Sequence, residues 1–135
     1  AVYGDTVLLK VLTSAPLETA GFRHGFSTRR GEVAGVASGT KDALAAGFTF
    51  VGPTADANIF TLACSVGFDP ASLYQANQVH GSRVVRVEGA PSLVRAEGAD
   101  ALVARAPRPL VGPPPSVGVR TADCVPVLVA DRKTG

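Results

Sequence analysis

Short apolar runs separated by turn-forming residues set the strongest limit on how this 135-residue chain can fold. Glycine and proline, present 15 and 10 times, bound most of these runs, which is typical of short strands joined by compact loops. Hydrophobic residues make up 46% of the chain, which is enough apolar material for a core. We therefore expect one folded domain of the α/β or α+β class with a substantial sheet.

The apolar pattern predicts several strands and one clear helix. The expected strands lie at residues 7–12, 21–31, 73–79, 83–87, 101–104, 117–121 and 126–130. The helix is expected over residues 54–66, capped by Thr54 or Asp56, because apolar residues recur there at helical spacing. Gly67 stands where a left-handed residue would end it. A helical turn at 41–46 is left open, and a proline-rich loop is expected over 107–115.

Charge and apolar patterning exclude several classes of partner. The formal net charge is +2 and no basic block occurs, so we expect no nucleic-acid partner. No apolar run approaches the roughly 18 residues of a membrane span, and the first residues lack signal-peptide order. With two cysteines there is no disulfide framework. We expect a soluble cytoplasmic protein without a membrane partner.

Two segments contain residues suited to metal or nucleophilic chemistry. Asp123 and Cys124 lie between two apolar runs beside a proline, where side chains emerge at a strand end. Cys124 is a candidate thiolate ligand or nucleophile, the alternative being a buried, packing cysteine. His80 follows an apolar run and precedes Gly81, and Gln78 shares its expected strand face. The alternative for His80 is an ordinary surface or core histidine.

A third segment is rich in arginine. Arg23, Arg29 and Arg30 surround His24 and Ser27 and could hold phosphate through forked contacts; the alternative is a solvated face. Cys64 is expected to pack inside the helix. A catalytic zinc takes three protein ligands, so a third beside His80 and Cys124 must come from His24, Asp123 or outside this chain.

Three segments resemble one known family. They are HGFSTRRG (24–31), QVHGSRVVRV (78–87) and GADALVA with VGVRTADCVPVLVAD (98–131), which are similar to the YfiH-like proteins, also labelled laccase-domain or polyphenol oxidase proteins and purine nucleoside phosphorylases. The resemblance implies packed mixed β-sheets flanked by helices. It also implies a metal held by His, Cys and His, of which the first two match His80 and Cys124. The third belongs to a His-Ala-Gly-Trp-Arg-Gly segment, and this chain has no Trp. The chain therefore resembles the N-terminal part of a longer family domain, with the proline-rich loop as an insertion.

The resemblance further implies a zinc-dependent purine nucleoside phosphorylase with adenosine deaminase activity. Adenosine, inosine and methylthioadenosine would be its nucleosides, with phosphate as cosubstrate. We predict that Asp123 and Arg29 are catalytic, Asp123 as a general base or ligand-orienting group and Arg29 as the phosphate holder. Gln78, Ser27 and Arg29 are predicted to contact substrate, and His80 and Cys124 to bind zinc.

Three alternatives stay open. A copper-dependent, laccase-like polyphenol oxidase would use two His and one Cys, although such copper sites often add a Met and this chain has none. A peptidoglycan-editing hydrolase would need a cleft for an amino-acid–sugar conjugate. An inactive truncated scaffold would follow if the third ligand is missing.

Overall fold

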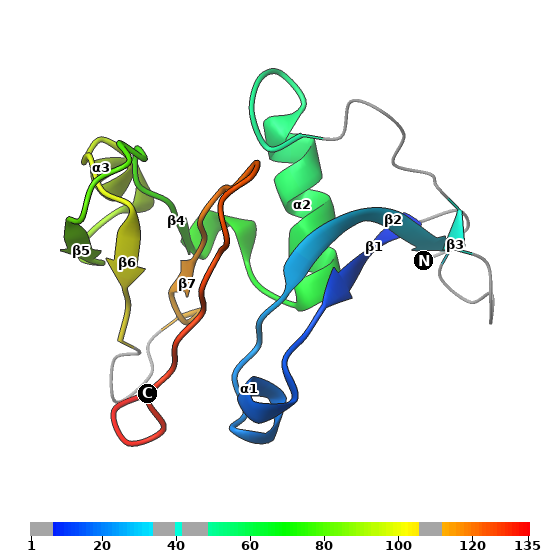
Figure 1. Ribbon diagram of the computed structural model, residues 1–135, viewed down its shortest axis with the longest axis horizontal. Coiled ribbons are helices and arrows are strands. Elements are labelled where there is room, and N and C mark those ends of the chain that lie inside the picture. The colour runs from blue at the N-terminus through cyan, green and yellow to red at the C-terminus, as the bar shows by residue number, and fades with distance from the viewer. Residues whose placement is uncertain (1–6, 34–39, 42–48, 106–111) are drawn as a thin grey trace. The chain divides into compact units, whose positions relative to one another are not determined.

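The chain forms two compact units, Ala1–Gly67 and Phe68–Gly135. The computed structural model describes residues 7–33, 40–41, 49–105 and 112–135 (Figure 1). Helices and strands occur together in both units, so the predicted mixed α/β class is confirmed. The organisation of residues 1–135 as one domain stays a prediction.

The first unit contains an antiparallel sheet of three strands in the order β1-β2-β3. These are β1 (Val7–Leu12), β2 (Phe26–Val33) and β3 (Thr40–Lys41). The short helix α1 (Ala15–Thr19) connects the first two strands. A bulge between Leu9 and Val11 interrupts the β1–β2 register, and such a bulge bends and twists a strand.

Helix α2 (Ala55–Val66) packs against β1 (Figure 1). Leu9, Ile59 and Ala63 form the buried apolar positions of this contact, and the Leu9 N–H donates to Ser65 Oγ at 2.8 Å. The helix ends at Gly67, whose φ of 91° is left-handed and whose N–H donates to the Ala63 carbonyl. The predicted helix and its glycine stop are therefore confirmed.

The second unit is built from two short parallel strand pairs. β4 (Leu73–Tyr74) pairs with β7 (Ser116–Val117), and β5 (Val84–Arg86) pairs with β6 (Ala101–Val103). The short helices η1 (Pro70–Ser72) and α3 (Pro91–Arg95) complete it. Its core consists of buried small and branched side chains with two larger neighbours packed on them, namely Ala76, Val85, Val94, Ala99, Tyr74 and Leu102.

Four predicted strands differ from the structure. The run 73–79 is a strand only at Leu73–Tyr74, and 117–121 is replaced by Ser116–Val117, because side chains bind the backbone beyond these points. The run 21–31 begins as a strand only at Phe26. The residues before it belong to the end of α1, because the Phe22 N–H donates to the Leu17 carbonyl. Residues 126–130 are not a strand.

Two short helices were not predicted, and two predictions fall partly outside the described residues. α1 and α3 were missed because five residues are too few to display helical periodicity, although each has a proline among its first two residues. Of the possible turn at 41–46, Lys41 lies in β3 and the rest lies outside the described residues, as does most of the proline-rich loop. Among the helices in the described part of the chain, none has the length and apolarity to cross a membrane.

Candidate functional site

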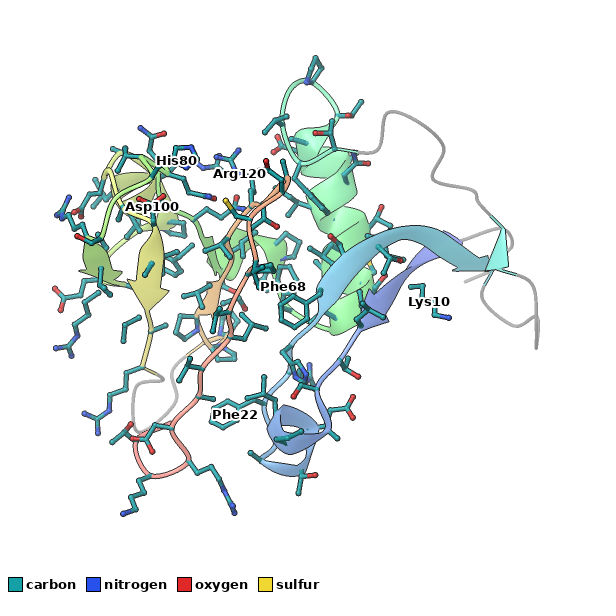
Figure 2. The ribbon with its side chains drawn as sticks, viewed as in Figure 1. Lys10, Phe22, Phe68, His80, Asp100 and Arg120 are labelled. Carbon is teal, nitrogen blue, oxygen red and sulfur yellow. The ribbon has the colours of Figure 1, made fainter. Side chains whose placement is uncertain are left out.

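The second unit places His80 in a loop that runs beside the segment before β6. Asn77 forms an isolated parallel bridge with Gly98: its N–H donates to the Glu97 carbonyl at 2.9 Å, and its carbonyl accepts from the Ala99 N–H at 3.0 Å. This bridge brings the residues after Asn77 next to Asp100. Figure 2 shows the His80 and Asp100 side chains close together in this unit.

The Asp100 carboxylate accepts hydrogen bonds from three consecutive backbone N–H groups. Val79 donates at 3.2 Å to Oδ1, His80 at 2.9 Å to Oδ1 and Gly81 at 2.7 Å to Oδ2. Successive N–H groups that converge in this way form an anion-binding concavity. The Gly81 N–H, followed by those of His80 and Val79 and the charge of the imidazole, lowers the pKa of Asp100 against a smaller opposing effect of desolvation. The carboxylate is thus held ionised.

His80 has an unusual backbone conformation. Its φ is 58°, and no other non-glycine residue in the described part of the chain has a positive φ. L-residues adopt this left-handed region at a cost of about 1–3 kcal/mol when the surroundings impose it. The side chain is exposed, and its ring nitrogens form no hydrogen bond with another residue in the described ranges. The imidazole is therefore open to a ligand.

Gln78 links this loop to the segment that leads to Cys124. Its Nε2 donates to the Arg120 carbonyl at 2.7 Å and its Oε1 accepts from the Arg120 N–H at 2.8 Å. The carboxamide therefore pairs with the backbone as a neighbouring strand would, although no strand continues there. Gln78 lies two residues before His80, and Arg120 lies four before Cys124. The two predicted ligands are thereby carried on segments tied to each other.

Asp123 and Cys124 both lie on an irregular, exposed segment. The alternative of a buried, packing Cys124 is wrong, because the thiol faces solvent. The expectation that Cys64 packs inside its helix is also wrong: it is exposed on α2, on the side away from the buried Ile59 and Ala63. An open imidazole and an open thiol fit zinc or copper by the chemistry of their donor atoms. The described residues contain no group of three or more His, Cys, Asp or Glu that could hold a metal ion.

The remaining candidates belong to the first unit. Ser27 is exposed on β2, opposite Val11. Arg29 also lies on β2, and its side chain lies outside the described part of the structure, as does that of Arg30. Arg23 donates from Nη1 to the Gly67 carbonyl at 2.7 Å, so it stabilises the end of α2, where a cation is favoured.

Both ring nitrogens of His24 are engaged by backbone. Nε2 accepts from the Ser14 N–H at 2.7 Å, and Nδ1 lies 2.9 Å from the Phe22 carbonyl. This pairing assigns the proton to Nδ1. His24 therefore holds the start of α1, and it would have to give up the Ser14 bond to ligate a metal through Nε2.

Asp100 is the residue of this site that the sequence did not single out. It lies in the segment GADALVA, where an aspartate before an apolar run is an ordinary turn residue. The sequence signal for Asp100 is indirect: the three consecutive N–H groups of residues 79–81 need an acceptor. That need becomes visible only when the bridge between Asn77 and Gly98 is known.

The chain matches one protein-family model and several curated proteins. A family model described as multi-copper polyphenol oxidoreductase laccase matches residues 23–135. Purine nucleoside phosphorylases of Mycobacterium tuberculosis H37Rv and Mycobacterium bovis are each 39% identical to the chain over 79 residues. This stretch is 58% of the chain and 29% of each relative, so the match spans less than a third of these curated proteins. No solved structure matches the chain significantly.

Proposed function

This chain belongs to the multi-copper polyphenol oxidoreductase laccase family, and on that premise we propose that it is a zinc-dependent purine nucleoside phosphorylase that also deaminates adenosine. The observation that carries the proposal is the family match over residues 23–135 together with relatives named purine nucleoside phosphorylase. The proposed substrates are adenosine, inosine and methylthioadenosine, with phosphate. The proposed setting is the cytoplasm, where exposed free thiols such as Cys64 and Cys124 stay reduced.

Phosphorolysis defines what the residues have to do. A phosphate oxygen attacks C1′ of the nucleoside, the glycosidic C–N bond breaks, and the purine leaves with the bonding electrons and takes up a proton. In the proposal Arg29 holds the phosphate through a forked, charge-assisted contact, and Ser27 and Gln78 contact the nucleoside. The two bonds of Gln78 to Arg120 use one Nε2–H and one Oε1 lone pair, so the carboxamide keeps a second donor and a second acceptor position for the nucleoside. Asp123 acts as general base or orients the neighbouring Cys124.

The proposed metal ligands are His80 and Cys124. Their support is that both side chains are exposed and that their segments are joined through Gln78 and Arg120. When bound, zinc supplies Lewis acidity near neutral pH, which suits adenosine deamination. The chain contributes the direction of the imidazole and the access of solvent to the thiol.

The direct test is phosphate-dependent release of a free purine. The purified protein is incubated with each nucleoside, with and without phosphate, and the products are separated by chromatography. We expect free base and ribose 1-phosphate (methylthioribose 1-phosphate from methylthioadenosine) in equal amounts only when phosphate is present. Base release that ignores phosphate, or no release from any of the three nucleosides, would contradict the proposal.

Variants of two arginines test the phosphate site. Arg29→Ala should raise the KM for phosphate about tenfold or more, as the loss of a charge-assisted contact predicts, while Arg132→Ala, on an exposed part of the second unit, should leave it unchanged. An unchanged KM in Arg29→Ala would remove this residue from the mechanism.

A copper-dependent polyphenol oxidase is the second candidate, because the matching family is described as a laccase. Elemental analysis and an oxygen electrode separate the two functions. The nucleoside proposal predicts bound zinc and no oxygen uptake with a diphenol. Stoichiometric copper with oxygen consumption would favour the oxidase instead.

A further inference from the structure

We propose that Asp100 is a positioning residue that fixes the backbone of residues 79–81 and thereby sets the direction in which His80 presents its imidazole. The proposal rests on the proposed role of His80 as a metal ligand. It goes beyond that role by assigning a function to a carboxylate that binds no substrate and no metal itself.

The Asp100 carboxylate binds the backbone on both sides of His80. Its two oxygens receive the N–H groups of Val79, His80 and Gly81, which are the residue before His80, His80 itself and the residue after it. A carboxylate that spans three successive amides fixes both peptide planes that flank the middle residue. The Cα–Cβ bond of His80 is therefore fixed in direction before any ligand is present.

The backbone of His80 shows why such a clamp is needed. At a φ of 58°, a histidine would relax toward the right-handed or extended region unless the surroundings hold it. Gly81 does not take the left-handed conformation, although glycine would adopt it without cost. The strain is thus located on the residue with the chemically useful side chain, where charge-assisted bonds can offset it.

The surroundings anchor Asp100 firmly enough for this task. The next residue begins β6, which pairs with β5, and the Asp100 N–H donates to the Arg83 carbonyl. Ala99, on its other side, is fully buried in the core of the unit. The carboxylate therefore extends from a fixed backbone, whereas the His80 loop is exposed and depends on it. Groups that hydrogen-bond a metal-ligating side chain commonly change metal affinity by 10–100-fold when removed, and we expect the same direction of effect for a carboxylate that orients the ligand through its backbone.

Asp100→Asn, with Asp69→Asn as the matched control, tests the proposal. Asparagine keeps one acceptor oxygen and loses the other, so at least one of the three bonds is lost. Asp69 also accepts a backbone N–H, from Ala71 at 2.9 Å, in the same unit but at helix η1. Amide hydrogen exchange of residues 79–81 is measured without metal, and zinc affinity is measured by competition with a chromophoric chelator.

We expect Asp100→Asn to speed exchange of the His80 or Gly81 amide about tenfold and to weaken zinc binding about 10–100-fold. Asp69→Asn should change neither measurement. Faster exchange with wild-type zinc affinity would overturn the positioning role, and so would unchanged exchange. If Asp100→Asn does not fold, Asp100→Glu reads the same two quantities with a displaced carboxylate. A wild-type protein that binds no zinc would overturn the metal site and the positioning role together, and it is recognised before any variant is made.

Discussion

Side chains take the place of backbone partners around His80. Gln78 binds the N–H and the carbonyl of Arg120, and Asp100 accepts three amides in succession. These side-chain hydrogen bonds hold together segments that backbone hydrogen bonds would join in a continuous sheet. The loop can therefore depart from strand geometry and expose the imidazole while the N–H groups of residues 79–81 stay paired.

A stability measurement distinguishes the two possible roles of Gln78. Gln78→Ala should lower the free energy of unfolding by about 1–3 kcal/mol, because two hydrogen bonds to a half-buried segment are lost. Gln78→Glu keeps the acceptor for the Arg120 N–H but turns a carboxylate oxygen toward the Arg120 carbonyl, so it should lower the free energy of unfolding at least as much. Urea unfolding measures both. A Gln78→Ala variant with wild-type stability and a raised KM for nucleoside would instead make Gln78 a substrate ligand alone.

The sequence predicts residues at this scale where residue type and neighbours suffice. His80, before a glycine, and Cys124, between two apolar runs, could be named as candidates from residue type alone. Their exposure in the structure agrees with a binding role, and ligation itself stays a prediction. Asp100 could not be named, because its partners lie about twenty residues away and are backbone groups, which are the same for every residue type.

At the scale of elements, prediction succeeded where local signals were complete. Residues 7–12 form the predicted strand, and α2 is one residue shorter than predicted because its period and its terminal glycine are both local features. Residues 126–130 failed for the opposite reason. A strand requires a partner with which to pair, and none of the described strands pairs with this run. Val125, Val127 and Val129 are accordingly 83%, 72% and 89% exposed.

Substitutions at Gly67 test how much its left-handed backbone contributes to α2. At a φ of 91°, Gly67→Ala should destabilise the protein by about 1 kcal/mol because Cβ is disfavoured there. Gly67→Asn should cost less, since asparagine tolerates this region better. Thermal unfolding of the three proteins gives the ranking. Equal stability of the alanine and asparagine variants would contradict a backbone origin.

At the scale of the whole molecule, the family match extends over both units, from residue 23 to residue 135. The residues of the proposed function come from both units: Ser27 and Arg29 lie in the first unit, and Gln78, His80, Asp123 and Cys124 lie in the second. Sequence motifs could group these residues because a family retains motif order along the chain. Local patterns could not, since the separation between His80 and Cys124 carries no information about distance in space.

We propose that the His80 imidazole and the Cys124 thiolate bind one cation, and X-ray absorption spectroscopy of the zinc-loaded protein reports on both ligands at once. We predict one coordination shell containing sulfur at about 2.3 Å and nitrogen at about 2.0–2.1 Å. Cys124→Ser should remove the sulfur, and Cys64→Ser, the matched control at the other exposed thiol, should retain it. A wild-type spectrum with nitrogen and oxygen neighbours only, or one that loses its sulfur in Cys64→Ser, would contradict the claim.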